Sequence, residues 1–154
     1  MKKLIECVPN FSEGRDKKKI SDIVNCIASV SGSTVLDVDS GEDTNRTVVT
    51  IVGEPTVVAE AAFQGIRRAS EILDMTQHAG THPRMGATDV CPFIPISGVS
   101  NEECIKISKD VGKRVGEELN IPVFLYEKSA TSLNRVKLPD IRKGEYEGLS
   151  DKLN

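Results

Sequence analysis

The sequence predicts an α+β fold of the ferredoxin-like type, a two-layer sandwich in the order βαββαβ, with an additional helix and short strand toward its C-terminal end. Three observations support this prediction. Strand-like and helix-like apolar patterns follow one another in that order along residues 4–96. The third predicted strand is apolar on both faces over residues 48–52, as an internal strand should be. The fourth contains Pro92 and Pro95, which suit an edge strand.

The first half of the chain is predicted to form a strand, a helix and a hairpin. A strand is expected over residues 4–8, followed by a turn over residues 9–14. The next apolar residues recur at the spacing of one helical face, which Ser31-Gly32-Ser33 ends: Ile20, Ile23, Val24 and Ile27. Two strands should follow, over residues 34–40 and 46–52. In the first of them Asp37 and Asp39 alternate with Leu36 and Val38.

The second half is predicted to form two longer helices around one more strand. Pro55 suits the first turn of a helix whose apolar face is formed by Val58, Ala62, Ile66, Ala69 and Leu73. A strand is expected over residues 89–96. The spacing of Ser100 and Glu103 is that of a capping box, and it opens a helix lined by Cys104, Ile107, Val111 and Val115. A last short strand over residues 122–127 and a peripheral helix over residues 139–149 complete the prediction.

This topology orders the four main strands 4-1-3-2 and puts the helices on one face of the sheet. With 154 residues, the chain is long enough for one domain over residues 1–154. Val48 and Val52 point away from the helices, and leaving such a row in water forgoes a few kcal/mol at about 25 cal/mol per Å². We therefore expect a partner outside this core, such as a second sheet, to cover the other face.

Composition argues against several classes of partner. The net charge is −3, aromatic residues are 4% and tryptophan is absent, so we expect no nucleic-acid partner. The four cysteines show no C-x-x-C spacing, which argues against a zinc ribbon or a thioredoxin-type site. The N-terminus lacks the apolar region of a signal peptide, and no window reaches the ~20 apolar residues of a membrane helix. We expect a cytoplasmic protein with free thiols and no membrane partner.

The most informative segment is residues 78–86, which read HAGTHPRMG. It holds both histidines of the chain, His78 and His82, and glycine and proline prevent it from forming a regular helix. Histidine can take up and return a proton near neutral pH. Functional residues also concentrate in loops. His82 is therefore the first candidate for a catalytic group, whereas His78 is more simply explained as a structural residue.

Five segments together carry a family resemblance. They are residues 8–15 (VPNFSEGR), 37–39 (DVD), 45–50 (NRTVVT), 78–86 (HAGTHPRMG) and 89–96 (DVCPFIPI). In this order and spacing they resemble the glutamate formimidoyltransferase family, from Cys7 to about Leu149. The resemblance implies transfer of a formimino group from N-formimino-glutamate to N5 of tetrahydrofolate, in histidine breakdown. It also implies two ferredoxin-like subdomains stacked sheet to sheet with the folate between them, of which this chain matches only the first.

The resemblance also implies roles for particular residues. The catalytic histidine of the family matches His82, and its partner aspartate matches Asp39. One neutral imidazole can take the proton from the attacking nitrogen and return it to the leaving nitrogen. A carboxylate can orient that imidazole. Formyl transfer, which needs similar proton handling, is an alternative reaction.

Four further residues are candidates for substrate binding. Arg46 and Arg84 can bind the carboxylates of glutamate or of the folate tail in bidentate fashion. Asn10 and Ser12 lie in the turn before the first helix, whose amides and N-terminus can favour an anion. The alternative for Ser12 is an ordinary helix cap.

Two other functions compete with this hypothesis. A metal-dependent hydrolase could use His78 and His82 with Asp89 or Cys91, but the spacing of the histidines brings two ligands together only on a helix. A non-enzymatic module could bind folate, or pair with a second subdomain or another copy of itself through the sheet face.

Overall fold

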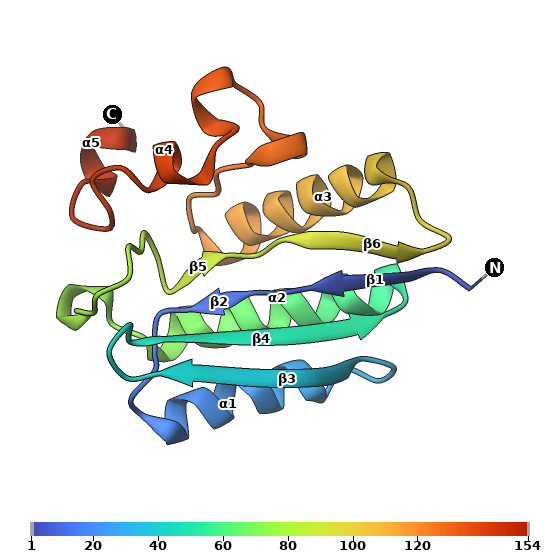
Figure 1. Ribbon diagram of the computed structural model, residues 1–154, viewed down its shortest axis with the longest axis horizontal. Coiled ribbons are helices and arrows are strands. Elements are labelled where there is room, and N and C mark those ends of the chain that lie inside the picture. The colour runs from blue at the N-terminus through green and yellow to red at the C-terminus, as the bar shows by residue number, and fades with distance from the viewer. Residues whose placement is uncertain (1, 154) are drawn as a thin grey trace.

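The computed structural model describes residues 2–153, which form an α+β fold with one six-stranded antiparallel sheet. Three long helices lie on one face of this sheet (Figure 1): α1 (Lys17–Ala28), α2 (Pro55–Ile72) and α3 (Asn101–Leu119). The strands are β1 (Leu4–Cys7), β2 (Asn10–Phe11), β3 (Thr34–Gly41), β4 (Arg46–Gly53), β5 (Thr88–Val90) and β6 (Phe93–Ser97). Two short helices, α4 (Leu138–Arg142) and α5 (Leu149–Leu153), lie near the β5 edge.

The sheet has the order β5-β2-β4-β1-β6, with β3 along the other side of β4. Both β1 and β2 pair with β4, in registers that set Cys7 opposite Ile51 and Asn10 opposite Val48. The prediction therefore placed the turn of residues 9–14 too early in the chain, because Asn10 and Phe11 pair again with β4 directly after Pro9. The strand predicted over residues 89–96 is likewise interrupted at Cys91 and Pro92, where β5 ends and β6 has not begun.

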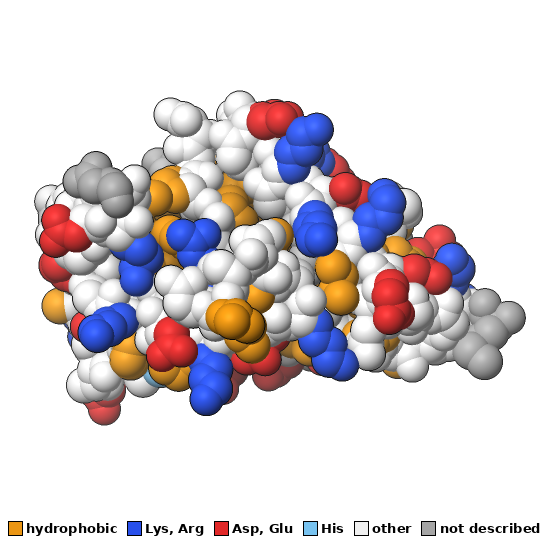
Figure 2. Space-filling model, turned by 90° about the horizontal axis from the view of Figure 1, so that it is seen from above, with side chains coloured by type: hydrophobic (Ala, Val, Ile, Leu, Met, Phe, Trp, Pro, Cys, Tyr) orange, Lys and Arg blue, Asp and Glu red, His pale blue; other side chains and the backbone are white. Residues whose placement is uncertain are grey.

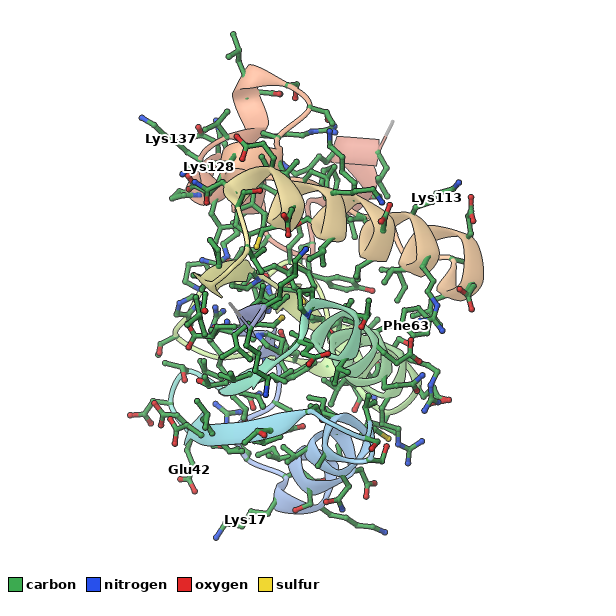
Figure 3. All side chains as sticks on the ribbon, turned by 90° about the vertical axis from the view of Figure 1, so that its right-hand side faces the viewer. Lys17, Glu42, Phe63, Lys113, Lys128 and Lys137 are labelled. Carbon is green, nitrogen blue, oxygen red and sulfur yellow. The ribbon has the colours of Figure 1, made fainter. Side chains whose placement is uncertain are left out.

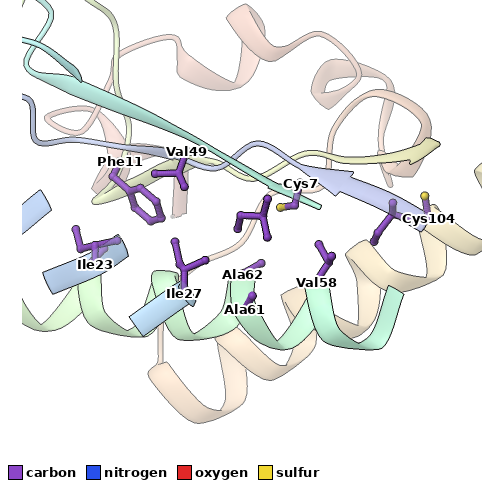
Figure 4. Close-up of a cluster of buried hydrophobic side chains, with 12 residues drawn as sticks. Cys7, Phe11, Ile23, Ile27, Val49, Val58, Ala61, Ala62 and Cys104 are labelled. Carbon is purple, nitrogen blue, oxygen red and sulfur yellow. The ribbon is translucent and has the colours of Figure 1, made fainter. Parts of the chain in front are cut away.

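The core lies between the sheet and the helices, as the helical spacing predicted. Val49 and Ile51 of β4 are fully buried against Ile23 and Ile27 of α1 and the small residues of α2 (Figure 4). A second cluster joins α2 to α3 around Phe63, which the side view places between these two helices (Figure 3). The guanidinium of Arg114 also covers the Phe63 ring, 3.6 Å from its centroid.

The opposite side of the sheet is open over β3, β4, β1 and β6 within residues 2–153 (Figure 1). We call it the open face; its side chains are those of Glu6, Asp37, Asp39, Val48, Thr50, Val52, Ile94 and Ile96. Ile94 is 40% exposed and Ile96 is 52% exposed. The pairing with β4 directs Asp37 and Asp39 away from the helices, as the alternation of β3 predicted, although a bulge interrupts the register at Leu36.

Two predictions about the C-terminal part are wrong. Residues 122–127 form no strand, because Val123 and Leu125 pack over Gly112 of α3 and pair with no sheet edge. A Cβ at Gly112 would lie 3.2 Å from Val123 Cγ1, so the glycine is what allows this approach. The helix predicted over residues 139–149 splits into α4 and α5, because Gly144 turns the chain at a φ of +88°. Among residues 2–153, no helix combines the length and the apolar character needed to cross a bilayer.

Candidate active site

The histidine loop, residues 78–86, is held against the turn between β3 and β4. Thr81 donates its backbone N–H to the Asp43 carbonyl at 3.0 Å, and Asn45 Nδ2 donates to the Ala79 carbonyl at 3.1 Å. Gly80 lies so close to this turn that a Cβ there would be 2.3 Å from the Thr44 carbonyl oxygen. The loop therefore depends on a glycine at that position for its place in the fold.

His78 is a structural residue in this geometry. Its Nε2 lies 2.8 Å from the Asn45 carbonyl oxygen, which only accepts, so Nε2 carries the proton. Its Nδ1 then accepts from Arg84 Nε at 3.0 Å. Both ring nitrogens are thus used inside the protein, in agreement with the simpler of the two explanations offered by the sequence.

Arg84 is 6% exposed and is surrounded by acceptors. Besides His78 it contacts Glu145 at 3.2 Å and Glu147 at 2.6 Å, both from the segment between α4 and α5. These partners and the His78 carbonyl occupy its five N–H donors. Substrate binding by Arg84 stays a prediction, one that this arrangement does not favour.

The ion pair with Arg84 lowers the pKa of the Glu147 carboxyl to about 2 from its usual 4.5. A carboxylate with a lowered pKa stabilises the fold above its ordinary pKa, and it loses that contribution as the pH falls through the folded value. The Glu147–Arg84 pair should therefore persist to about pH 2. Because the Glu147 side chain is 66% exposed, its contribution to stability is small.

His82, the second histidine of the loop, is half-buried. Its Nδ1 is 3.0 Å from Arg46 Nη1 and 2.7 Å from the Pro83 carbonyl oxygen. Its Nε2 has no hydrogen-bond partner within residues 2–153. Of the two histidines, only His82 therefore has a ring nitrogen available to a substrate.

Arg46 links His82 to the sheet. Its Nε and Nη2 donate to Asn10 Oδ1 at 2.9 and 2.6 Å, and its Nη1 also reaches Asp89 Oδ2 at 3.0 Å. Burial lowers the pKa of the Arg46 guanidinium, and the hydrogen bond to Asp89 opposes this shift. One Nη2 hydrogen remains without an acceptor in the described part of the chain. Arg46 thus retains one donor that could reach a substrate carboxylate.

Asp89 is the buried anion of the site, with a side chain that is 1% exposed. Its Oδ1 accepts from the Met85 backbone N–H at 2.6 Å. Its Oδ2 accepts from Arg46 and also from Arg142 Nη2 of α4, at 2.6 Å. A carboxylate this deeply buried stays charged at low cost only with such partners.

Ser12 and Asn10, the two other residues predicted to bind substrate, make contacts within the protein. Ser12 does not cap α1; its hydroxyl donates to the Gly86 carbonyl at 2.7 Å, and Asp16 caps the helix by accepting from Lys18 and Lys19. Asp16 thus takes two amides of the first turn of α1, those of Lys18 and Lys19, that an anion would otherwise use. Asn10 is buried and supports Arg46.

Asp39 is exposed on the open face, opposite Val48, which in turn pairs with Asn10. No hydrogen bond joins Asp39 to His82 within residues 2–153. Both nevertheless lie toward the end of the sheet at which Arg46 begins β4. The partnership between Asp39 and His82 stays a prediction.

A cavity of about 750 Å³ adjoins the site between α3, the β5–β6 edge and the C-terminal segment. Asp89 and Arg142 are among the residues that line it, together with Met85 and Gly86 of the histidine loop. Seen from above, hydrophobic side chains show between charged ones on this side of the molecule (Figure 2). Cys91 lines the cavity, and its Sγ lies 3.5 Å from that of the fully buried Cys7, whose pKa burial raises well above its usual value. All four cysteines are free.

A metal centre built on the two histidines is not favoured. Both nitrogens of His78 are engaged, and His82 faces Arg46. Among the described residues 2–153, no three His, Cys, Asp or Glu side chains come together as a metal-binding group.

Comparison with known proteins agrees with the motifs in this loop. A model of the formiminotransferase domain, N-terminal subdomain, matches residues 4–154. This chain belongs to the formiminotransferase family.

This formiminotransferase chain is similar over nearly its whole length to several longer proteins. Glutamate formimidoyltransferase of Streptococcus pyogenes serotype M1 is 51% identical over 153 residues, covering 99% of this chain and 51% of the relative. Formimidoyltransferase-cyclodeaminase of Mus musculus is 54% identical over 153 residues, which is 99% of this chain and 28% of the relative. Glutamate formimidoyltransferase of Thermoplasma acidophilum is 47% identical over 144 residues, covering 94% of this chain and 48% of the relative. The chain thus spans about half or less of each of these relatives.

Sequence reasoning missed three residues of this formiminotransferase site. Asn45 has a left-handed φ of 51° and is 7% exposed, and its position at the end of a hairpin turn was the available signal. Asp89 was considered only as a metal ligand. Arg142 gave no signal at all, because no local pattern relates a residue of α4 to β5.

Asn45 supplies the first testable prediction. Replacing Asn45 with alanine should lower the free energy of unfolding by about 2–4 kcal/mol, because two hydrogen bonds are lost and alanine is strained at this φ. The lost bonds are those to the Ala79 carbonyl and from the Gly14 N–H. Urea unfolding measures the change. Asn45→Gly removes the same bonds without the strain, so it should be about 1 kcal/mol less damaging; equal losses in the two variants would contradict the account.

Proposed function

We propose that this chain is the first subdomain of a glutamate formimidoyltransferase, in which His82 handles protons while a formimino group passes from N-formimino-L-glutamate to N5 of tetrahydrofolate. The observation that carries the proposal is the free Nε2 of His82, held beside the open face by Arg46. The family and the names of the relatives support the reaction.

The chemistry requires two proton movements. N5 of the folate attacks the amidine-like carbon and a tetrahedral intermediate forms; the new nitrogen–carbon bond leaves N5 with a proton to lose. The bond from that carbon to the glutamate nitrogen then breaks, and this nitrogen must gain a proton. A single imidazole whose Nε2 faces the reacting atoms can accept the first proton and deliver it to the second nitrogen, a contribution of about 100- to 10,000-fold.

The open face is the proposed surface for the folate and for a second subdomain. It combines exposed apolar side chains, Ile94 and Ile96, with the carboxylates of Asp37 and Asp39. Such a patch usually marks an interaction site. The relatives are longer than the matched region, which supports a second subdomain as the cover. Pairing of two copies through this face, without catalysis, is the second candidate and is favoured by the same exposed residues.

We propose that residues 1–154 form this one subdomain and that its strands follow the predicted ferredoxin-like order. This assignment counts β1 with β2, and β5 with β6, as two interrupted strands. The strand order then becomes 4-1-3-2. The pairing of β1 and β2 with β4, all antiparallel, supports it.

Asp39 is proposed to orient His82 once substrate is bound. Asp39→Asn should lower kcat about tenfold or more, because a neutral amide stabilises the imidazolium less than a carboxylate does. Asp37→Asn is the matched control, since Asp37 lies on the same strand and face but opposite Thr50. Steady-state assays of the two variants separate the outcomes. Equal activity of Asp39→Asn and Asp37→Asn would remove Asp39 from the mechanism.

The proposed activity is tested in a chimaera in which this chain replaces the matching half of the Streptococcus pyogenes relative. Formation of formimino-tetrahydrofolate from the two substrates is expected in the chimaera. The isolated chain is assayed beside it, with sedimentation to detect pairing of copies. Folate binding without transfer in a folded chimaera would favour the non-enzymatic candidate and contradict the proposal.

A further inference from the structure

We infer that Arg142, from α4, is a positioning residue that acts on His82 through Asp89 and Arg46. The inference rests on the proposed role of His82, and it assigns part of the site to a helix far along the chain. It begins from the buried carboxylate of Asp89, whose Oδ2 is shared by Arg46 Nη1 at 3.0 Å and Arg142 Nη2 at 2.6 Å.

The two guanidinium groups are buried to a similar extent, with side chains 12% and 15% exposed for Arg46 and Arg142. At this depth solvent screens the charges weakly, so the position of each cation depends on the others. Because Arg142 makes the shorter contact, it takes up part of the acceptor capacity of Asp89. Arg46 Nη1 carries two hydrogens, so besides the one it donates to Asp89 it has one for a second acceptor.

That second acceptor decides the proton position on His82. Two groups compete for Nδ1, Arg46 Nη1 at 3.0 Å and the Pro83 carbonyl at 2.7 Å. A guanidinium can only donate and a carbonyl can only accept, so Nδ1 cannot satisfy both at once. When Arg46 donates to Nδ1, the ring proton lies on Nε2; when Nδ1–H donates to Pro83, Nε2 is an open base.

Arg142 therefore shifts the balance between an acid-like and a base-like Nε2. Without Arg142, Asp89 has one guanidinium partner and draws Arg46 toward itself. Nδ1 is then left to the Pro83 carbonyl, and the population with a proton on Nδ1 rises. The effect is specific to His82, because the Nδ1 of His78 is held by Arg84 and its Nε2 by Asn45.

The chain suits a direct test, because His82 and His78 are its only histidines. Isotope-labelled histidine gives ring-nitrogen signals for both in NMR spectra of the isolated chain, without substrate. In Arg142→Gln we expect the Nδ1 signal of His82 to move toward the protonated position while the signals of His78 stay in place. Arg142→Lys, which keeps a cation for Asp89, should restore most of the original position.

Lys143→Gln is the matched control, since it removes the same charge from an exposed neighbour of Arg142. It should leave both histidines unchanged. The inference is overturned if His82 signals in folded Arg142→Gln match those of the unaltered chain, or if His78 shifts as much as His82. In the chimaera, Arg142→Gln should lower kcat about tenfold with little change in KM. A chimaera without activity would contradict the proposed reaction, whereas the NMR result stands independently of it.

Discussion

His82→Ala is expected to lower transfer turnover in the chimaera by about 100- to 10,000-fold, the usual contribution of a general acid–base group. The fold should be retained, because His82 is half-buried and its side chain contacts Arg46 and Pro83 at the edge of the sheet. Binding of tetrahydrofolate should change little, since the lost group acts on protons in the transition state.

The measurement is kcat at saturating concentrations of both substrates, with circular dichroism to confirm the fold. His78→Gln is the control variant, because both ring nitrogens of His78 bind protein groups, Arg84 and the Asn45 carbonyl, and neither is available to a substrate. His78→Gln should mainly lower the free energy of unfolding. A His82→Ala enzyme with near-normal turnover would end the proposed role of this imidazole.

The second large effect is expected at Gly80. A Cβ at this position would lie 2.3 Å from the Thr44 carbonyl oxygen and 2.8 Å from the Thr44 carbonyl carbon, both backbone atoms. The histidine loop must therefore move in Gly80→Ala. We expect a loss of about 1–3 kcal/mol in the free energy of unfolding, as for other overpacked sites. Transfer should fall about 100-fold, because a displacement near 1 Å is enough to misplace a catalytic group.

Gly86→Ala is the control within the same loop. Its nearest non-bonded atom, the Thr88 carbonyl oxygen, would be 3.7 Å from the added Cβ, an ordinary contact. The two variants add the same methyl group at two positions of the same loop. Similar losses of transfer in both would mean that the anchoring of the loop at Thr44 is unimportant.

The parts of the fold that follow local patterns were predictable. The apolar spacing of α1 and α2 identified the buried face of each helix, and the alternation in β4 identified both faces of the central strand. The interruptions at Pro9 and at Cys91–Pro92 were not foreseen, because they depend on pairing with strands far away in the sequence. The behaviour of residues 122–127 was missed for a related reason: Gly112 offers a surface on α3 that no local signal describes.

In the candidate site, too, local patterns were predictable and long-range contacts were not. His82 stood out because histidine, glycine and proline occur together in one loop, and the apolar outer row of β4 indicated the open face. The partners of His82 were less accessible to sequence reasoning. Arg46 was proposed to bind substrate, whereas most of its donors hold Asn10, Asp89 and His82. The buried position of Asp89 and its contact with Arg142 depend on tertiary packing, which residue spacing alone does not reveal.

The most direct test of proton transfer by residue 82 is chemical rescue of the His82→Ala chimaera with free imidazole. The truncated side chain leaves space beside Arg46, so added imidazole should restore turnover in proportion to its concentration, while the unaltered chimaera shows no such response. Turnover that stays at the level of the variant at every imidazole concentration, with folate still bound, would contradict the assignment of acid–base catalysis to this position.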